Sequence, residues 1–243
     1  DFQAAEKVTS QGRKIARRLV GILKDQHAET IEADTDGVYF VAPPRISNEK
    51  EERGFIEAIS EELPDGINLS HDGRYAAMLS LKAKNYALMS FDGQLILKGS
   101  SLRNRRDERI FRTLIQQLTP LILDRKAEQA SMLYHDLAVQ IQGEQLSPRD
   151  ISRSETITEK TFSNPNLRRL AAAAEGCKIG ERISVYQRVD GSLSRVEHYE
   201  GDEDKEYLLR RLHDMARRFQ SLYEDAQFRT LFPLIRMPAV EQL

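Results

Sequence analysis

The sequence contains little of what marks a secreted, disulfide-bonded or membrane protein. Cys177 is the single cysteine among 243 residues, which excludes an intrachain disulfide and a cluster of thiolate metal ligands. A lone thiol is typical of proteins kept in a reducing cellular interior. No apolar run is long enough to cross a bilayer, and no signal-peptide pattern occurs. We therefore expect an intracellular protein with no membrane partner.

An excess of charge of one sign is missing as well. The net charge is −2, so no bulk basic character points to a polyanion. The charges are nevertheless spread unevenly. Residues 81–112 hold eight lysines and arginines against three acids, whereas residues 197–206 hold six acids against Lys205. Such local asymmetry is a better sign of a polyanionic partner than the total charge.

Length and composition indicate a globular protein. Hydrophobic residues make up 40% of the chain and charged residues 30%, and 243 residues suffice for one large domain or two modest ones. The chain opens on Asp1 without a methionine, so we expect a fragment or a processed piece of a longer protein.

Apolar periodicity predicts the secondary structure of the first hundred residues. A helix is expected over 4–24, a strand, turn and strand over 30–44, and an acidic amphipathic helix over 49–63. Two Asp-Gly dipeptides then lie between apolar runs, which is a strong hairpin signal. The four runs that these dipeptides join, expected as strands of a meander, are 67–71, 74–81, 84–91 and 94–99.

The pattern turns helical after Gly99. Two helical stripes follow, the second one after Pro120. The remaining expected elements are a short helix over 166–176, a strand over 180–188, an Asp-Gly turn at 190–191 and a long helix over 205–223.

Two aspartates stand at the tip of the first expected hairpin, in the stretch Ile-Glu-Ala-Asp-Thr-Asp-Gly-Val-Tyr-Phe. Strand side chains alternate, so Asp34 and Asp36 can point the same way, and Gly37 suits a reversal of the chain. Two carboxylates placed in this way repel each other unless a divalent cation lies between or beside them. Mg²⁺ is held by one or two protein carboxylates with phosphate oxygens and water, so the pair suits phosphoryl or nucleotidyl transfer.

Other interpretations of Asp-x-Asp-Gly remain open. The same pattern occurs in ordinary exposed turns that bind nothing. A metal-dependent glycosyltransferase also uses Asp-x-Asp, but it predicts a nucleotide-binding α/β unit upstream, where this sequence offers one helix. An EF-hand is excluded, because Val38 and Arg45 stand at the fifth and twelfth loop positions, where acids are required.

Four motifs occur in a fixed order in the first half of the chain. A helix leads into Asp34-Thr35-Asp36, and Ala83-Lys84-Asn85-Tyr86 follows. Lys98-Gly99 and Arg105-Arg106-Asp107 come next. Together they resemble the C-terminal portion of a family B DNA polymerase, with its Asp-Thr-Asp palm motif, its Lys-Lys-Arg-Tyr segment and its Lys-Gly…Arg-Arg-Asp stretch. The resemblance covers nearly the whole chain and is strongest over 3–112.

The resemblance implies an α+β fold, in which a palm fragment with an antiparallel sheet and helices is followed by a mostly helical thumb. It assigns residues 1–123 to the palm and residues 124–243 to the thumb. Asp36 would be a direct ligand of two catalytic Mg²⁺ ions, and Asp34 would be the neighbouring catalytic carboxylate. The acidic segment 197–206 is expected to face solvent or another part of the enzyme.

The resemblance also implies contacts with DNA. Lys84 and Tyr86 would hold the primer–template duplex near the primer terminus, and the basic run would contact phosphates. The full set of expected DNA-binding residues is Lys82, Lys84, Tyr86, Lys98, Arg103, Arg105 and Arg106. The alternatives are a core position for Tyr86 and a solvated helix start for the three arginines.

The sequence departs from the family pattern near the aspartates. Gly37 stands where a serine is usual, and Ile31-Glu32-Ala33 precedes the pair where a tyrosine and a glycine are common, which indicates a divergent branch. The motifs that carry the other metal aspartate and the fingers lysine are expected upstream of Asp1, in an N-terminal polymerase portion or subunit.

The implied function is that of a DNA-directed DNA polymerase. A primer 3′-hydroxyl would attack the α-phosphate of a deoxynucleoside triphosphate, and this chain would be inactive without the N-terminal portion. Its partners would be primer–template DNA, deoxynucleoside triphosphates and that portion, in the cytoplasm (nucleoid) or another DNA-containing compartment. The alternatives are a catalytically inactive, polymerase-like DNA-binding subunit and the Asp-x-Asp glycosyltransferase.

Overall fold

The computed structural model describes residues 2–34, 37–143 and 145–238. By its internal contacts the chain divides into two compact units, residues 1–96 (unit 1) and 97–243 (unit 2). The regular elements of the described residues are helices and three small antiparallel sheets, so the predicted α+β class is confirmed. Within the described ranges no helix is long and apolar enough to cross a membrane.

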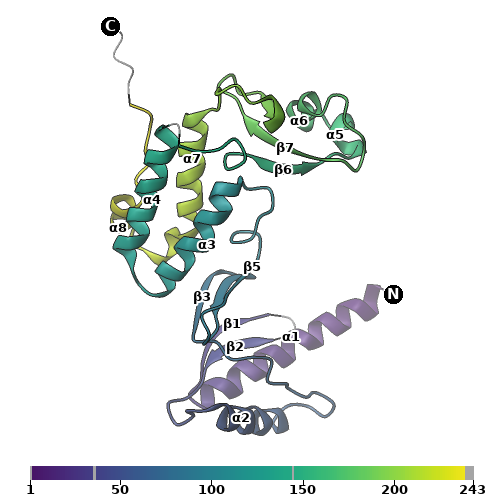
Figure 1. The fold of residues 1–243 in the computed structure, drawn as a ribbon. Helices are drawn as coiled ribbons and strands as arrows, with labels where there is room; N and C mark the ends of the chain where they lie inside the picture. Colours follow the sequence, from purple (N-terminus) through teal and green to yellow (C-terminus); the bar gives the residue numbers. More distant parts are fainter. Residues whose placement is uncertain (1, 35–36, 144, 239–243) are drawn as a thin grey trace. The chain divides into compact units, whose positions relative to one another are not determined.

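Unit 1 begins with a helix, a hairpin and a second helix (Figure 1). Helix α1 spans Phe2–Asp25, strand β1 (Glu29–Ala33) pairs antiparallel with β2 (Val38–Val41), and α2 spans Glu49–Glu61. All four elements lie where apolar periodicity predicted them.

The core of unit 1 is formed by α1, α2 and one face of the hairpin. Its buried residues are Leu19, Ile22, Leu23, Ala28, Phe55, Ile59 and Leu63. Val38 and Phe40 of β2 pack against this core. On α1, Leu19, Ile22 and Leu23 are buried, whereas Val8 is 69% exposed. Removal of this apolar area from water therefore fixes β1 and β2 on α1 and α2.

A three-stranded sheet follows, with the order β3-β4-β5. These strands span Ala77–Lys82, Asn85–Met89 and Leu95–Lys98. The predicted Asp92-Gly93 turn joins β4 to β5, and Gly93 has a φ of 83°, which glycine adopts without steric cost. Lys84 lies in the turn between β3 and β4 instead of on a strand, with a φ of 62°.

The strand predicted over 67–71 is wrong. Leu69 packs against the core of unit 1, and its N–H donates a hydrogen bond to the Ser60 hydroxyl of α2 (3.0 Å) instead of to a strand. Asp72-Gly73 consequently makes no hairpin, and β3 begins only at Ala77. The local turn signal is outweighed here by packing of the run on the preceding helix α2.

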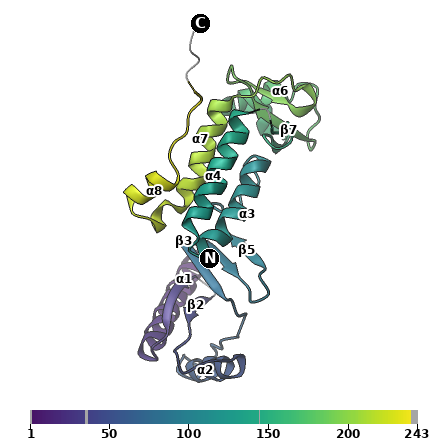
Figure 2. The ribbon, with the colours of Figure 1, turned by 60° about the vertical axis from the view of Figure 1, so that its left-hand side comes forward.

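Unit 2 contains a helical bundle. Helices α3 (Arg109–Leu123), α4 (Ala127–Gln142) and α7 (Lys205–Ala216) lie side by side in Figures 1 and 2. Helix α8 (Asp225–Leu231) packs on α4. The helix predicted over 205–223 is α7 followed by the 3₁₀ helix η3, Arg217–Leu222. Buried side chains such as Phe111, Tyr134 and Phe219 fill the bundle.

A smaller part of unit 2 lies between α4 and α7 in the chain. Its sheet has the order β6-β7-β8, and short helices cover it. The elements are β6 (Arg153–Thr156), α5 (Glu159–Ser163), η1 (Pro165–Leu167), α6 (Arg168–Ala173), β7 (Arg182–Gln187), β8 (Leu193–Arg195) and η2 (Val196–His198). The predicted helix, strand and Asp-Gly turn of this region are confirmed, and Gly191 has a φ of 81°.

The acidic segment 197–206 folds back on β7. Asp202 accepts hydrogen bonds from the Tyr186 hydroxyl (2.7 Å) and from Arg188. Asp204 caps the N-terminus of α7 by accepting the Tyr207 N–H (2.8 Å). These two carboxylates therefore face other residues of unit 2 and not mainly solvent.

Candidate metal and nucleic-acid site

Asp34 lies directly after β1, where the first hairpin turns. Its N–H donates to the Gly37 carbonyl (2.9 Å), which closes the tip of the hairpin. Its side chain is 33% exposed, and its Oδ1 atom lies 3.1 Å from the Nζ atom of Lys84. Asp36, the other predicted metal carboxylate, lies outside the described residues. Within those residues no group of three or more metal-binding side chains occurs.

Two hairpins of unit 1 face each other through two cross-strand pairs. Glu32 pairs with Tyr39 across β1 and β2, and Ser80 pairs with Tyr86 across β3 and β4. The Ser80 hydroxyl donates a hydrogen bond to Glu32, and the hydroxyl oxygens of Tyr39 and Tyr86 are 3.3 Å apart. Opposite residues of antiparallel strands point to the same face, so each pair presents both side chains to the other hairpin. This contact brings the turn that carries Lys84 to Asp34.

Three predicted DNA-binding residues lie on the β3–β4 hairpin. The Lys84 side chain is 68% exposed, and its backbone N–H donates to Oε1 of Glu32 (2.7 Å). Lys82, at the end of β3, is also exposed. Tyr86 is half-buried, with its ring centroid 5.2 Å from that of Tyr39. The hairpin therefore offers two cations and a partly covered phenol at one end of the sheet.

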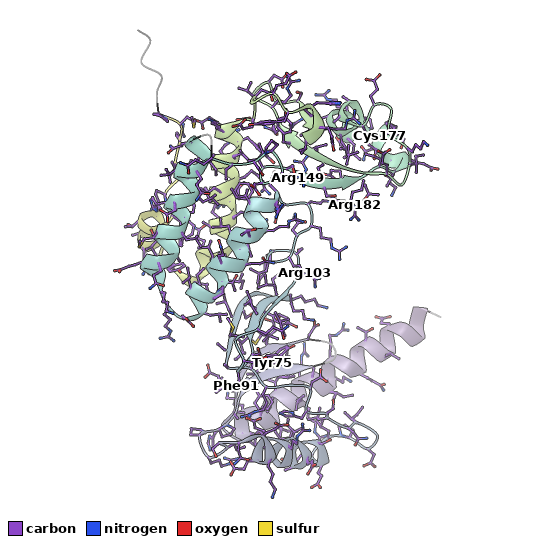
Figure 3. All side chains as sticks on the ribbon, viewed as in Figure 1. Tyr75, Phe91, Arg103, Arg149, Cys177 and Arg182 are labelled. Carbon is purple, nitrogen blue, oxygen red and sulfur yellow. The ribbon has the colours of Figure 1, made fainter. Side chains whose placement is uncertain are left out.

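The other predicted DNA-binding residues belong to unit 2. Lys98 ends β5, and Arg103, Arg105 and Arg106 lie in an irregular loop (the basic loop, residues 99–108). All four side chains are exposed. Helix α3 begins only at Arg109, so the three arginines are not a helix start. Figure 3 labels Arg103 on this loop.

The end of the basic loop is held by a buried ionic network that sequence reasoning missed. The Asp107 side chain is 3% exposed and accepts hydrogen bonds from Arg211 of α7 (2.9 Å) and from Arg218 of η3 (2.8 and 3.0 Å). Arg218 also donates to the Ser101 carbonyl (2.8 Å), at the start of the loop. The loop is thus anchored at both ends to the bundle.

Glu108 extends the network. Its side chain is 2% exposed and accepts hydrogen bonds from the Tyr207 hydroxyl (2.6 Å) and from Arg211 (3.3 Å). Burial and the charge of Glu108 raise the pKa of Tyr207 to about 12, so this hydroxyl stays a donor at neutral pH. One signal was readable in the sequence: Arg211 and Arg218 are seven residues apart and fall on one helical face.

Known proteins with similar sequences are DNA polymerases. No protein-family model matches the chain. DNA polymerase 1 of Pyrococcus abyssi is 30% identical over 105 residues, which are 42% of this chain and 14% of that protein. The DNA polymerase of Pyrococcus horikoshii is 25% identical over 205 residues, 79% of this chain and 17% of that protein.

A solved structure matches over both units. The family B DNA polymerase from the hyperthermophilic archaeon Pyrobaculum calidifontis superimposes with a TM-score of 0.67 and 18% identity, and the match covers 92% of this chain and 30% of that one. The resemblance to the family B DNA polymerases is confirmed. This chain spans 14% and 17% of the length of the two curated DNA polymerases compared above. The fold is thus that of part of a family B DNA polymerase.

Proposed function

We propose that this chain supplies metal-binding carboxylates and primer–template grip to a family B DNA-directed DNA polymerase. The observation that carries this proposal is the meeting of Asp34 and Lys84 from two separate hairpins. Both residues belong to motifs that resemble the polymerase pattern, and polymerases are the known proteins with similar sequences. Residues outside these 243 supply the remaining metal aspartate and the triphosphate-binding lysine.

The donor set at the hairpin fits Mg²⁺. The Asp34 carboxylate is partly exposed and already lies against one cation, the ammonium of Lys84. With Asp36 it provides two hard oxygen ligands, the number that Mg²⁺ takes from protein when phosphate oxygens and water complete the octahedron. Mg²⁺ held there would stabilise the negative charge on the attacking and leaving oxygens of nucleotidyl transfer. Asp34 and Asp36 hold the metal, and Lys84 neutralises phosphate beside it.

The grip on DNA is expected to be mainly electrostatic. Lys82, Lys84 and Tyr86 contact the duplex backbone near the primer terminus, in keeping with the exposure of both ammonium groups. The basic loop with Arg103, Arg105 and Arg106, following Lys98, adds phosphate contacts. The same proposal assigns residues 1–123 to the palm of the polymerase and residues 124–243 to its thumb. The protein works in a DNA-containing compartment.

Lys84→Ala tests the grip directly. Each cation that neutralises a phosphate releases a counterion. A plot of the logarithm of duplex affinity against the logarithm of salt concentration therefore has a slope of about −0.9 per phosphate contact. We expect Lys84→Ala to reduce the magnitude of this slope by about 0.9, similarly on unrelated duplexes. The measurement is fluorescence anisotropy of labelled primer–template over a salt series. Lys50→Ala, an exposed lysine on α2, is the matched control and should leave the slope unchanged. Equal slopes for wild type and Lys84→Ala would refute the contact.

Tyr86→Phe tests whether the phenol contacts DNA or only Tyr39. The substitution keeps the ring and removes the hydroxyl that lies 3.3 Å from the Tyr39 hydroxyl. We expect weaker duplex binding, together with a loss of about 0.5–1.5 kcal/mol of folding stability. Tyr39→Phe removes the same tyrosine–tyrosine hydrogen bond and is the control. If both variants bind duplex equally, the Tyr86 hydroxyl has a structural role only.

A further inference from the structure

Glu32 is a half-buried carboxylate that the proposed metal and DNA contacts do not use. It lies two residues before Asp34, and strand side chains two apart share a face. The Ser80 hydroxyl and the Lys84 N–H (2.7 Å) both donate hydrogen bonds to it. Glu32 therefore holds the backbone of the β3–β4 turn, and Asp34 holds the ammonium of Lys84 (3.1 Å).

The turn needs such a partner because its conformation is unfavourable. Lys84 has a φ of 62°, a left-handed region that a residue with a Cβ atom adopts only with support from its surroundings. The register of β3 and β4 also shifts between Ser80 and Lys82, which leaves the end of the hairpin irregular. The charged acceptor Glu32 makes a stronger hydrogen bond than a neutral one would. It thus favours the one turn geometry that aims Lys84 at Asp34.

We propose that Glu32 is a positioning residue, which keeps Lys84 in place when the metal takes Asp34. The proposal rests on the proposed polymerase function. A metal ion bound to Asp34 would repel the ammonium of Lys84 and break the Asp34–Lys84 ion pair. The side chain of Lys84 would then no longer be fixed by Asp34. The hydrogen bond from the Lys84 N–H to Glu32 persists. The freed ammonium then lies next to the metal carboxylate with its turn still ordered, ready for a primer–template phosphate.

Electrostatics alone predicts the opposite effect of removing Glu32. Deleting an acidic side chain near a polyanion strengthens binding, because a like-charge repulsion is removed. Positioning predicts weaker binding, because Lys84 loses its preferred conformation. The sign of the change in duplex affinity therefore separates the two effects.

The test compares Glu32→Ala with Glu32→Gln in the 243-residue chain. Glutamine can still accept the Lys84 N–H and can donate to the Ser80 hydroxyl, so it is the conservative rescue. Glu29→Ala, on an exposed position of the same strand, is the matched control. The two readouts are hydrogen exchange of the Lys84 amide and the salt dependence of primer–template affinity. Glu32→Met, which keeps the stem of the side chain, replaces the alanine variant if that variant unfolds.

We expect faster exchange of the Lys84 amide and weaker duplex binding in Glu32→Ala, with both restored in Glu32→Gln. Between about 50 and about 200 mM salt, the drop in affinity should be about 3.5-fold smaller than in wild type, the value of one lost phosphate contact. The double variant Glu32→Ala/Lys84→Ala should lose no more than Lys84→Ala alone.

The outcomes separate this inference from the proposed function. If Lys84→Ala lowers the salt slope while Glu32→Ala leaves slope and affinity unchanged or raises affinity, Glu32 does not position Lys84, and the polymerase role stands. If the wild-type chain has no affinity for duplex, the proposed function fails and the inference falls with it. Unchanged exchange of the Lys84 amide in Glu32→Ala also overturns the inference.

Discussion

Replacing Asp107 with alanine is expected to lower the free energy of unfolding by about 3–5 kcal/mol. The Asp107 carboxylate is almost fully buried and accepts hydrogen bonds from the guanidinium groups of Arg211 and Arg218. Its loss removes the carboxylate partner of Arg218 and one of the two carboxylate partners of Arg211, so part of the desolvation that these cations underwent on folding is no longer offset. The basic loop also loses its Asp107 anchor on α7 and η3.

Urea unfolding followed by circular dichroism measures this effect. Asp124→Ala is the matched control, because Asp124 is exposed and pairs only with the exposed Lys126 in the described structure (2.8 Å). The control should cost less than about 1 kcal/mol, as exposed ion pairs do. A loss below about 1 kcal/mol for Asp107→Ala, with an unchanged m-value, would contradict the structural importance of the network.

Replacing Asp36 with alanine is expected to reduce primer extension about a thousandfold or more. The measurement is made in an assembly that contains this chain together with the rest of the polymerase site. Loss of a metal ligand removes several kcal/mol of transition-state stabilisation, and about 4 kcal/mol corresponds to a thousandfold in rate. Duplex affinity should stay close to that of wild type, because Asp36 is not a phosphate contact.

Two further variants make this experiment specific. Asp65→Ala removes an exposed aspartate of unit 1 and should leave extension unchanged. Asp34→Ala should also impair extension, and it additionally frees Lys84 from its ion pair. Near-normal turnover of Asp36→Ala would mean that the pair is an ordinary turn. Duplex binding without extension in the wild-type assembly would favour the alternative of an inactive DNA-binding subunit.

The sequence determined most of the local structure because its signals are local. Apolar periodicity located α1, α2 and β7, and Asp-Gly placed the β4–β5 and β7–β8 turns, where glycine takes a positive φ. The ordered motifs also led to the polymerase resemblance, which similar sequences and a shared fold confirm. None of these inferences needed a contact between distant residues.

The tertiary structure alone decided which side chains meet. The run 67–71 lost its predicted strand because Leu69 packs on the core of unit 1 and bonds Ser60 of α2. Glu32 was read only as a departure from a pattern, yet it lies 52 positions before Lys84 and holds the N–H of that residue. Asp107 and Arg211 are 104 positions apart and share a partly buried hydrogen bond. Pairings across such separations depend on how hairpins and helices pack, and no local periodicity encodes them.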